Sequence, residues 1–489
     1  MRVVFASMGT GEVASFGIMY VSAALRRAGH EVELIESESV DIVLRAIGRD
    51  PPDVLAFSVT TGLHRIYLAW ARAVKRAFPW VITLMGGPHP TFFPEIVEDP
   101  SIDAIVIGEG EATAPLLLDA LGARDGRVVD GARYKLDGAI VQGGLRAPEQ
   151  HLDTLPWPDR ELFFNRSRFH ARFPVKPFLA SRGCPYRCTY CFNRTLNDMY
   201  RGRSRAVRTR SPASVVAEIR EVARRWPMKL VWFLDANFVV SRRWVEELCE
   251  RLARDVGLPF YCKVRPNLVD ESLARTLALG GCTGVGMGVE CGDDRLRNAV
   301  LERNISRETI LNACRCLHDV GIAVMSFNMV GLPGETYEMA RSTVDLNIEA
   351  RVEYAMATVF QPYPRTVLAQ RAIETGDFHG DFERIDTNYY STCQMRESVP
   401  GDRARIENLQ RLFGIAVAFP EIRRHLDRLV AINAPRFYRE LFKRHHRHSF
   451  YRHFYERYRN PEVGRLHGGL PAGGFSRSMT SGKDDRPWP

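Results

Sequence analysis

Three of the ten cysteines crowd into one short stretch of the chain. Cys184, Cys188 and Cys191 have the spacing C-x₃-C-x₂-C. Thiolates on one loop can each hold one iron of a [4Fe–4S] cluster, which leaves the fourth iron open to a small molecule. A zinc site would need a fourth Cys or His nearby, and no histidine lies between His170 and His318. The spacing therefore predicts an iron–sulfur cluster, and the scattered cysteines are expected to be buried thiols.

Length and composition indicate the number of domains and the class of protein. The 489 residues are enough for two or three domains, and 45% hydrophobic with 26% charged residues is typical of a globular chain. No apolar run is long enough for a membrane span, and the first residues enter a strand-like stretch without a signal peptide. We therefore expect a cytoplasmic protein. The net charge is +9, and part of this excess arises in the last third, where basic residues are typical of solvated helices, so no nucleic-acid partner is expected.

Residues 1–125 alternate short apolar runs with helical patterns. The runs lose polar alternation, which is typical of parallel strands buried on both faces. A doubly wound, Rossmann-like parallel sheet follows from this pattern. The predicted strands are Val3–Ala6, Val32–Ile35, Val54–Val59, Val81–Met85 and Ala104–Ile107.

Small and flexible residues follow these strands, at the edge where such sheets bind ligands. The predicted ligand-binding residues are Gly9, Ser58, Thr60, Gly86, Gly87, Gly108, Glu109 and Gly110. A nicotinamide site would need G-x-G-x-x-G after the first strand, and the pattern that begins at Gly9 lacks its last glycine. We exclude that cofactor.

Residues 126–170 have weak periodicity and are interpreted as a linker. A second β/α series is predicted over 171–385, and six such units form a partial (β/α)₆ barrel with its chemistry at the carboxyl ends of the strands. The predicted strands are Phe178–Ser181, Leu230–Leu234, Phe260–Val264, Val285–Val289, Ala323–Val330 and Ala355–Phe360. Residues 386–466 are predicted to be a helical C-terminal domain, either a lid over the barrel or a bundle that only buries its surface. The Gly-, Ser- and Pro-rich residues 467–489 are predicted to be a disordered tail.

The cysteine motif closely resembles that of the radical S-adenosylmethionine (SAM) family, and Tyr190 matches the aromatic residue before its last cysteine. The family chelates SAM at the open iron. Further matching segments end successive barrel strands: an F-x-D-x-N segment, an arginine, a G-V-E segment and a G-x-P-G-E-T signature. The resemblance implies SAM contacts at Tyr190, Asp235, Arg265, Glu290, Gly331, Pro333 and Glu335.

A Rossmann-like domain before such a barrel resembles the cobalamin-dependent radical SAM enzymes, called class B. The matching segments are Gly17–Tyr20, Leu25–Val32, Gly86–Thr91 and Val106–Glu111. The resemblance implies that cobalamin binds at the strand edge described above. The D-x-H-x-x-G string that places a histidine on cobalt is missing from residues 1–125. His64 and His89 are the candidate imidazoles near that edge, and we expect neither to bind cobalt.

The resemblance implies an enzyme that cleaves SAM reductively to a 5′-deoxyadenosyl radical and then transfers a methyl group to an unactivated carbon. The substrate is expected to be a small molecule or natural-product intermediate, and the electron donor a flavodoxin or ferredoxin. A cobalamin-dependent cyclase or rearrangement enzyme remains an alternative, as does a non-catalytic cobalamin- or redox-sensing module. Methylthiotransferases carry three further N-terminal cysteines, and residues 1–180 contain none.

Overall fold

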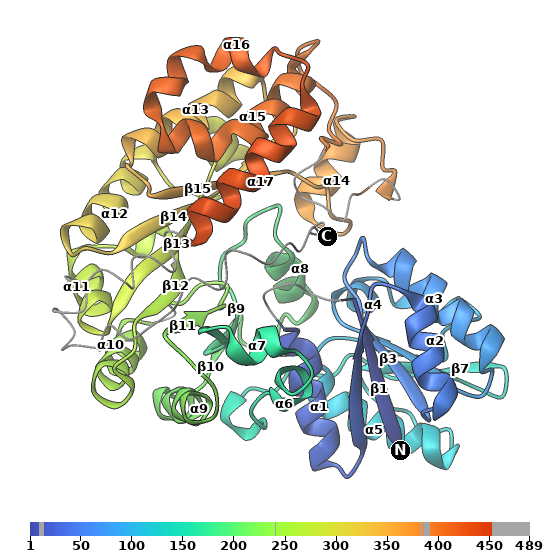
Figure 1. Cartoon of the computed structure of the whole chain (residues 1–489). Helices are drawn as coiled ribbons and strands as arrows, with labels where there is room; N and C mark the ends of the chain where they lie inside the picture. The colour runs from blue at the N-terminus through green and yellow to red at the C-terminus, as the bar shows by residue number, and fades with distance from the viewer. Residues whose placement is uncertain (9–13, 240, 383–384, 386–391, 452–489) are drawn as a thin grey trace. The chain divides into compact units, whose positions relative to one another are not determined.

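The computed structural model describes residues 1–8, 14–239, 241–382, 385 and 392–451 (Figure 1). The chain forms two compact units. Unit 1 contains residues 1–174, 197–214 and 221–228. Unit 2 contains residues 175–196, 215–220 and the chain from 229 onward.

Unit 1 is built on a doubly wound sheet. Five parallel strands lie in the order β2-β1-β3-β4-β5: β1 (Arg2–Ser7), β2 (Glu31–Glu36), β3 (Val54–Ser58), β4 (Ile82–Gly86) and β5 (Ala104–Val106). Val3 and Phe5 face a core shared with α1 (Phe16–Arg27) and α5 (Gly110–Ala123). Val4 and Ala6 face a second core shared with α2 (Val40–Arg49) and α3 (His64–Ala77). Because side chains alternate along a strand, these two cores cover both faces of the sheet and explain the continuous apolar runs.

The segment interpreted as a linker extends this sheet. β6 (Ala132–Leu136) pairs antiparallel with β5, and β7 (Ala139–Gln142) pairs antiparallel with β6. Asp137 and Gly138 join β6 to β7 with φ angles of 49° and 84°, which is the backbone of a type I′ hairpin turn. β7 is mostly exposed, so it lacks the apolar pattern that marks the other strands. Short helices follow: η2 (Leu152–Thr154), α6 (Glu161–Phe164) and α7 (Arg168–Arg172).

Unit 2 contains the partial barrel. Six parallel strands lie side by side: β8 (Val175–Phe178), β11 (Leu230–Phe233), β12 (Phe260–Val264), β13 (Cys282–Glu290), β14 (Ala323–Val330) and β15 (Tyr354–Val359). The connecting helices are α9 (Pro212–Arg225), α10 (Arg242–Arg251), α11 (Glu271–Leu279), α12 (Arg307–Asp319) and α13 (Tyr337–Glu349). Helices α10 to α13 line one side of the strands (Figure 1). Their N-caps are Ser241, Asp270, Ser306 and Thr336, whose side chains accept backbone N–H bonds of the first turn.

The first barrel strand, β8, begins three residues before the predicted strand Phe178–Ser181, so that prediction was wrong. β8 includes Pro177, a residue that cannot donate a backbone hydrogen bond. Among the described strands, β8 lies at the edge of its sheet and pairs with β11 alone, so Pro177 is tolerated there. Ser181–Gly183 forms a separate short strand, β9, which leads directly to Cys184.

The described C-terminal residues are helical, with α14 (Val367–Glu374), α15 (Asp402–Ala418), α16 (Leu426–Val430) and α17 (Pro435–Tyr451). α15 packs against β15, where the buried Gln410 donates a 2.9 Å hydrogen bond to the Ala357 carbonyl. This packing is what a surface-burying bundle requires. The expected tail, 467–489, lies outside the described residues. No helix in the described part of the chain is long and apolar enough to span a membrane.

Candidate functional site

The three predicted cluster cysteines lie on one loop that begins after β9. Cys188 is buried, and Cys184 and Cys191 are half-buried. Thr189, inside the loop, is fixed from two sides. Its backbone N–H and hydroxyl donate to the carbonyls of Leu301 (3.2 Å) and Val300 (2.7 Å), and its carbonyl accepts from the Leu368 N–H (2.9 Å). Helix α8 (Phe192–Met199) begins directly after Cys191. The loop is therefore held at its centre and at its end.

The thiols of the loop affect one another's ionisation. Burial raises the pKa of the Cys184 and Cys191 thiols. The other loop cysteines raise the pKa of Cys184 further, and Cys188 does the same for Cys191. Within the described residues, no three His, Cys, Asp or Glu side chains converge as ligands of a single ion. That does not bear on a cluster, because its thiolates hold different irons. The donor set fits a [4Fe–4S] cluster.

Arg265 binds the loop from the end of β12. Its Nη1 donates to the Cys188 sulfur at 3.4 Å, and its guanidinium stacks on the Tyr186 ring at 3.8 Å. Its Nε donates to Asn267 Oδ1 at 2.7 Å, and it also bonds the Arg303 carbonyl. Similarly, Asn193 Nδ2 lies 3.5 Å from the Cys191 sulfur. These N–H groups favour the thiolate form that binds iron.

A buried network closes the carboxyl end of β13. Arg303 Nη1 donates to Tyr190 Oη and to Glu290 Oε1, both at 2.8 Å, and Tyr190 Oη donates to Glu290 Oε1 at 3.1 Å. Arg303 Nη2 also donates to the Gly288 carbonyl at 2.5 Å. Glu290 has φ of +67°, a left-handed backbone that is costly for a non-glycine residue. A Cβ on Gly288 would lie 2.4 Å from Glu290 Oε1, so only glycine fits beside this carboxylate.

The sequence prediction missed Arg303, since no motif contains it. Its guanidinium is buried, and although burial lowers its pKa, Tyr190 and Glu290 together raise that pKa above its ordinary value. Arg303 therefore remains charged and neutralises the Glu290 carboxylate. Two of the residues predicted as SAM contacts, Tyr190 and Glu290, are therefore brought together by Arg303, which was not predicted.

Asp235 is engaged by the chain itself. One carboxylate oxygen accepts from the Ala180 N–H at 3.2 Å, and the other from the Ser181 hydroxyl at 2.5 Å. The side chain is buried, and burial raises its pKa. Asp235 thus fixes the turn between β8 and β9, which leads into the cysteine loop. The structure gives it a positioning role by these contacts, and SAM contact at Asp235 stays a prediction.

Gly331, Pro333 and Glu335 form a closed turn after β14. One oxygen of Glu335 accepts from the backbone N–H groups of Gly331 (2.5 Å) and Leu332 (3.0 Å). Burial raises the pKa of Glu335 to about 8. Gly331 has φ of +76°, and a Cβ there would lie 2.8 Å from the Cys393 sulfur. Glycine is therefore required at this position for both its backbone and its packing.

In unit 1, the predicted cobalamin residues lie where β3, β4 and β5 end. Ser58 ends β3 and Thr60 follows it, and Gly86 ends β4 and Gly87 follows it. Gly108 and Glu109 follow β5, and Gly110 begins α5. Gly9 lies outside the described residues. Gly87 and Gly110 have packing reasons of their own, because a Cβ would lie 3.0 Å from Val59 backbone atoms and 2.9 Å from Val21 Cγ2, respectively. Glu109 is held in a two-pronged ion pair by Arg208, at 2.6 and 3.0 Å.

The two histidines near this edge stack on each other. The rings of His64 and His89 are 4.1 Å apart, and His89 Nδ1 lies 3.1 Å from the Thr61 hydroxyl. Burial, aided by His64, lowers the pKa of His89 to about 3. His89 is therefore a neutral, buried residue near pH 7.

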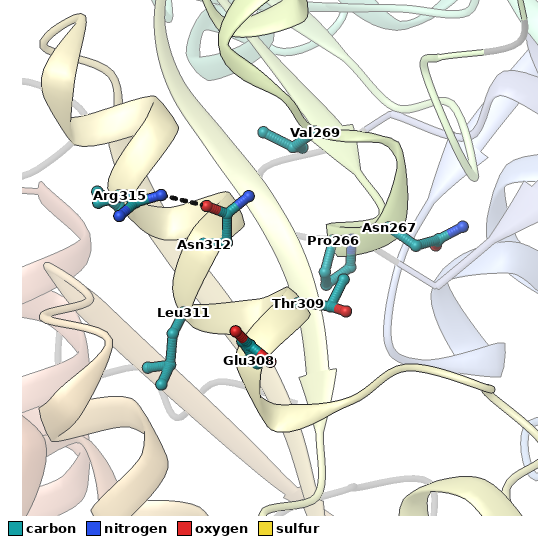
Figure 2. Close-up of a pocket in the computed structure, with 8 residues that line it drawn as sticks. All are labelled: Pro266, Asn267, Val269, Glu308, Thr309, Leu311, Asn312 and Arg315. Atoms are coloured by element: carbon teal, nitrogen blue, oxygen red, sulfur yellow. Dashed lines mark hydrogen bonds between the residues drawn. The ribbon is translucent and has the colours of Figure 1, made fainter.

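Unit 2 also has a surface pocket of about 470 Å³ between η4 (Pro266–Leu268) and α12. Figure 2 shows its lining side chains, with Arg315 and Asn312 hydrogen-bonded to each other on α12. None of the predicted site residues lines it. Asn267 connects it to the cysteine loop, through a 3.3 Å hydrogen bond from its Nδ2 to the Tyr186 hydroxyl. The pocket is separate from the predicted site.

Comparisons with known proteins agree with this geometry. Residues 178–346 match the Radical SAM superfamily, and residues 1–118 match the B12 binding domain. An uncharacterized methyltransferase of Pyrococcus horikoshii is 27% identical over 365 residues, covering 73% of this chain and 78% of that protein. An anaerobic magnesium-protoporphyrin IX monomethyl ester cyclase of Rubrivivax gelatinosus is 27% identical over 381 residues, covering 74% and 66%.

A solved structure shares the fold. The radical SAM methyltransferase TsrM of Kitasatospora setae, with cobalamin and a [4Fe–4S] cluster bound, has a TM-score of 0.62 at 18% identity, covering 76% of this chain and 75% of that one. The Rossmann-like sheet and the partial barrel predicted from the sequence are confirmed. Residues 178–346 are thus a radical SAM domain and residues 1–118 a B12 binding domain, so the chain carries the two domains of a cobalamin-dependent radical SAM enzyme.

Proposed function

We propose that this protein methylates an unactivated carbon of a small molecule or natural-product intermediate. The observation that carries the proposal is the three-thiol loop joined, in one chain, to an α/β unit that matches the B12 binding domain. The methyltransferase of Pyrococcus horikoshii, similar over most of both chains, supports methyl transfer as the reaction.

When bound, the cluster with SAM supplies a 5′-deoxyadenosyl radical and cobalamin supplies a methyl group. The residues of the chain hold and orient these groups. The cluster would be bound by Cys184, Cys188 and Cys191. Arg265 donates a hydrogen bond to the Cys188 sulfur and stacks on the Tyr186 ring. Asp235 keeps the loop entrance in place through Ala180 and Ser181.

For SAM, we propose that Tyr190, Arg265, Glu290, Gly331, Pro333 and Glu335 form its surroundings. Two features support this assignment. Arg303 keeps the Tyr190–Glu290 pair rigid and charge-balanced at the carboxyl end of β13. Within the described part of the chain, Glu335 Oε1 is buried without a hydrogen-bond partner, and a buried polar atom of this kind favours a bound ligand.

For cobalamin, we propose the strand-end residues Ser58, Thr60, Gly86, Gly87, Gly108 and Gly110. For Glu109 we propose an indirect role, through the ion pair that its carboxylate forms with Arg208. We also propose a reducing cytoplasmic setting, since all ten cysteines are free, and a flavodoxin or ferredoxin as the electron donor.

Product stoichiometry tests methyl transfer without knowledge of the substrate. Full-length protein carrying cluster and reduced cobalamin is incubated with SAM, and S-adenosylhomocysteine is quantified per bound cobalamin. We expect one equivalent, because cobalamin is remethylated by SAM. Protein that forms 5′-deoxyadenosine under reducing conditions but no S-adenosylhomocysteine would contradict methyl transfer.

That last result would favour the second candidate, a cyclase or rearrangement enzyme. The similarity to the magnesium-protoporphyrin cyclase of Rubrivivax gelatinosus supports this alternative. Such an enzyme would use SAM only as the source of the radical.

A further inference from the structure

Tyr200 combines a buried position with an unused hydroxyl. The residue directly follows α8 and its side chain is 8% exposed. Within the part of the chain that the structure describes, its hydroxyl has no hydrogen-bond partner. A buried hydroxyl without a partner is destabilising compared with the bare ring of phenylalanine. Its presence therefore favours a partner that is not part of the protein.

The Tyr200 hydroxyl lies at the end of β5, among the residues predicted to bind cobalamin. It packs so closely on Gly108 that a Cβ on that glycine would lie 2.0 Å from the phenolic oxygen. Gly108 has φ of +82°, and its N–H donates to the Thr91 hydroxyl at 2.9 Å. Because ligands of doubly wound sheets bind at this edge, the hydroxyl is at the place where cobalamin is expected.

Tyr200 is held there by contacts that do not involve its hydroxyl. The segment that contains it, residues 197–210, bonds to other residues of unit 1 at several points. Arg208 pairs with Glu109 and donates to the Glu149 carbonyl at 2.6 Å. Arg203 donates to the Leu145 carbonyl at 2.9 Å. The hydroxyl is consequently free to serve a ligand without being needed to anchor the segment.

The hydroxyl is a donor over the whole physiological pH range. Burial, aided by the nearby Glu109 carboxylate, raises the pKa of Tyr200 to about 12, so the phenol stays protonated. A neutral phenol donates well to amide carbonyl and phosphate oxygens. Cobalamin carries both kinds of oxygen, amides around its corrin ring and a phosphate in its nucleotide tail.

We propose that Tyr200 binds cobalamin by donating its hydroxyl hydrogen bond to an amide or phosphate oxygen of that cofactor. The cobalamin site then includes a residue from the segment that follows the cluster loop in sequence, outside residues 1–125. This inference rests on cobalamin binding and is independent of whether the enzyme transfers a methyl group.

The test compares Tyr200→Phe with the wild-type full-length protein, both with the cluster reconstituted and without cobalamin. Hydroxocobalamin affinity is measured by equilibrium dialysis, and the melting midpoint is measured with and without the cofactor. We expect about tenfold weaker binding in the variant, because one hydrogen bond to an otherwise buried oxygen is lost. The cobalamin-free variant should melt no lower than wild type, since only an unpaired hydroxyl is removed.

Tyr134→Phe is the matched control. Tyr134 is buried in the same unit, and its hydroxyl donates to the Arg127 carbonyl at 2.7 Å. This variant should melt lower without cobalamin and bind hydroxocobalamin with unchanged affinity. Equal affinity of Tyr200→Phe and wild type, or a lower midpoint of cobalamin-free Tyr200→Phe, would overturn the proposal.

Repeating the dialysis with cobinamide, which lacks the nucleotide tail, identifies the acceptor. If Tyr200→Phe also binds cobinamide more weakly than wild type does, the acceptor is one of the corrin amides. If the two proteins bind cobinamide equally, the acceptor is the phosphate. Wild-type protein that binds no hydroxocobalamin would overturn this proposal and the cobalamin assignment together. Weakened cobalamin binding with no S-adenosylhomocysteine formed would leave the Tyr200 contact standing and remove only methyl transfer.

Discussion

Arg303 and Glu290 form a buried ion pair at the end of β13, with 2.8 Å between Nη1 and Oε1. The arginine side chain is 5% exposed and the glutamate side chain 12%. In such a pair each charge depends on the other, because water does not solvate either one. The pair also holds Tyr190, the residue next to the proposed cluster ligand Cys191, so it joins the end of β13 to the cysteine loop.

Arg303→Met should lower the free energy of unfolding by about 3–5 kcal/mol, because Glu290 is left buried without its cation. The double variant Arg303→Met/Glu290→Gln should recover much of that loss, as measured by denaturant unfolding. Arg224→Met, which breaks an exposed pair with Glu221, is the control and should change little. A double variant as unstable as Arg303→Met alone would show that the charge pair is not the cause.

His89 should make stability depend on pH. Its pKa is about 3 in the folded protein against about 6.5 when unfolded, so the unfolded chain binds a proton as pH falls below about 6.5. Stability is therefore lost on acidification, by at most about 2 kcal/mol between pH 7 and pH 5. His89→Gln should flatten the unfolding profile in this range relative to wild type, and the exposed His379→Gln should not. Parallel profiles for wild type and His89→Gln would refute this.

The cobalt(II) form of bound cobalamin should show no axial histidine. The D-x-H-x-x-G string is absent from residues 1–125, and His89 is buried against Thr61 and His64. We expect an electron paramagnetic resonance spectrum without nitrogen splitting from a protein imidazole. The His64→Ala and His89→Ala variants should give the same spectrum. Splitting that either substitution abolishes would place that histidine on cobalt.

The C-terminal helices should act mainly through packing. Phe413 on α15 is fully buried, whereas Phe437 on α17 is 64% exposed. Phe413→Ala should lower the free energy of unfolding by about 3–5 kcal/mol, the usual cost of emptying an aromatic core site. Phe437→Ala should leave stability unchanged. If Phe437→Ala instead uncouples SAM cleavage from product formation at full stability, these helices form a lid over the barrel, the alternative that the sequence did not exclude.

The sequence predicted the fold where hydrophobic pattern alone determines an element. Most parallel strands of the two sheets are buried on both faces, so their apolar runs mark them clearly. β7 is an exposed hairpin strand, so it has no apolar pattern that would predict it. The local sign of the hairpin is the Asp137-Gly138 turn, which a search for apolar runs does not detect. The first barrel strand was predicted three residues too late, because a proline such as Pro177 is unusual inside a strand and is tolerated in β8 by its edge position.

The site could be predicted only as far as its motifs reach. The cysteines and the residues at the strand ends have recognisable spacing. Arg303 and Tyr200 contribute through tertiary contacts with Glu290 and Gly108, residues 13 and 92 positions away in the chain respectively, and neither has a local signature. Long-range partners of this kind become visible only once the strands are placed.

We propose that Cys184, Cys188 and Cys191 hold the cluster at which SAM is cleaved. The most direct measurement is 5′-deoxyadenosine formation by anaerobically reconstituted, chemically reduced protein. We predict that the wild type and Cys249→Ala, which alters a buried thiol of α10, both carry about four irons. Both should produce 5′-deoxyadenosine from SAM, whereas a variant with all three loop cysteines changed to Ala should do neither. Continued 5′-deoxyadenosine formation by the triple variant would show that these cysteines do not hold the cluster.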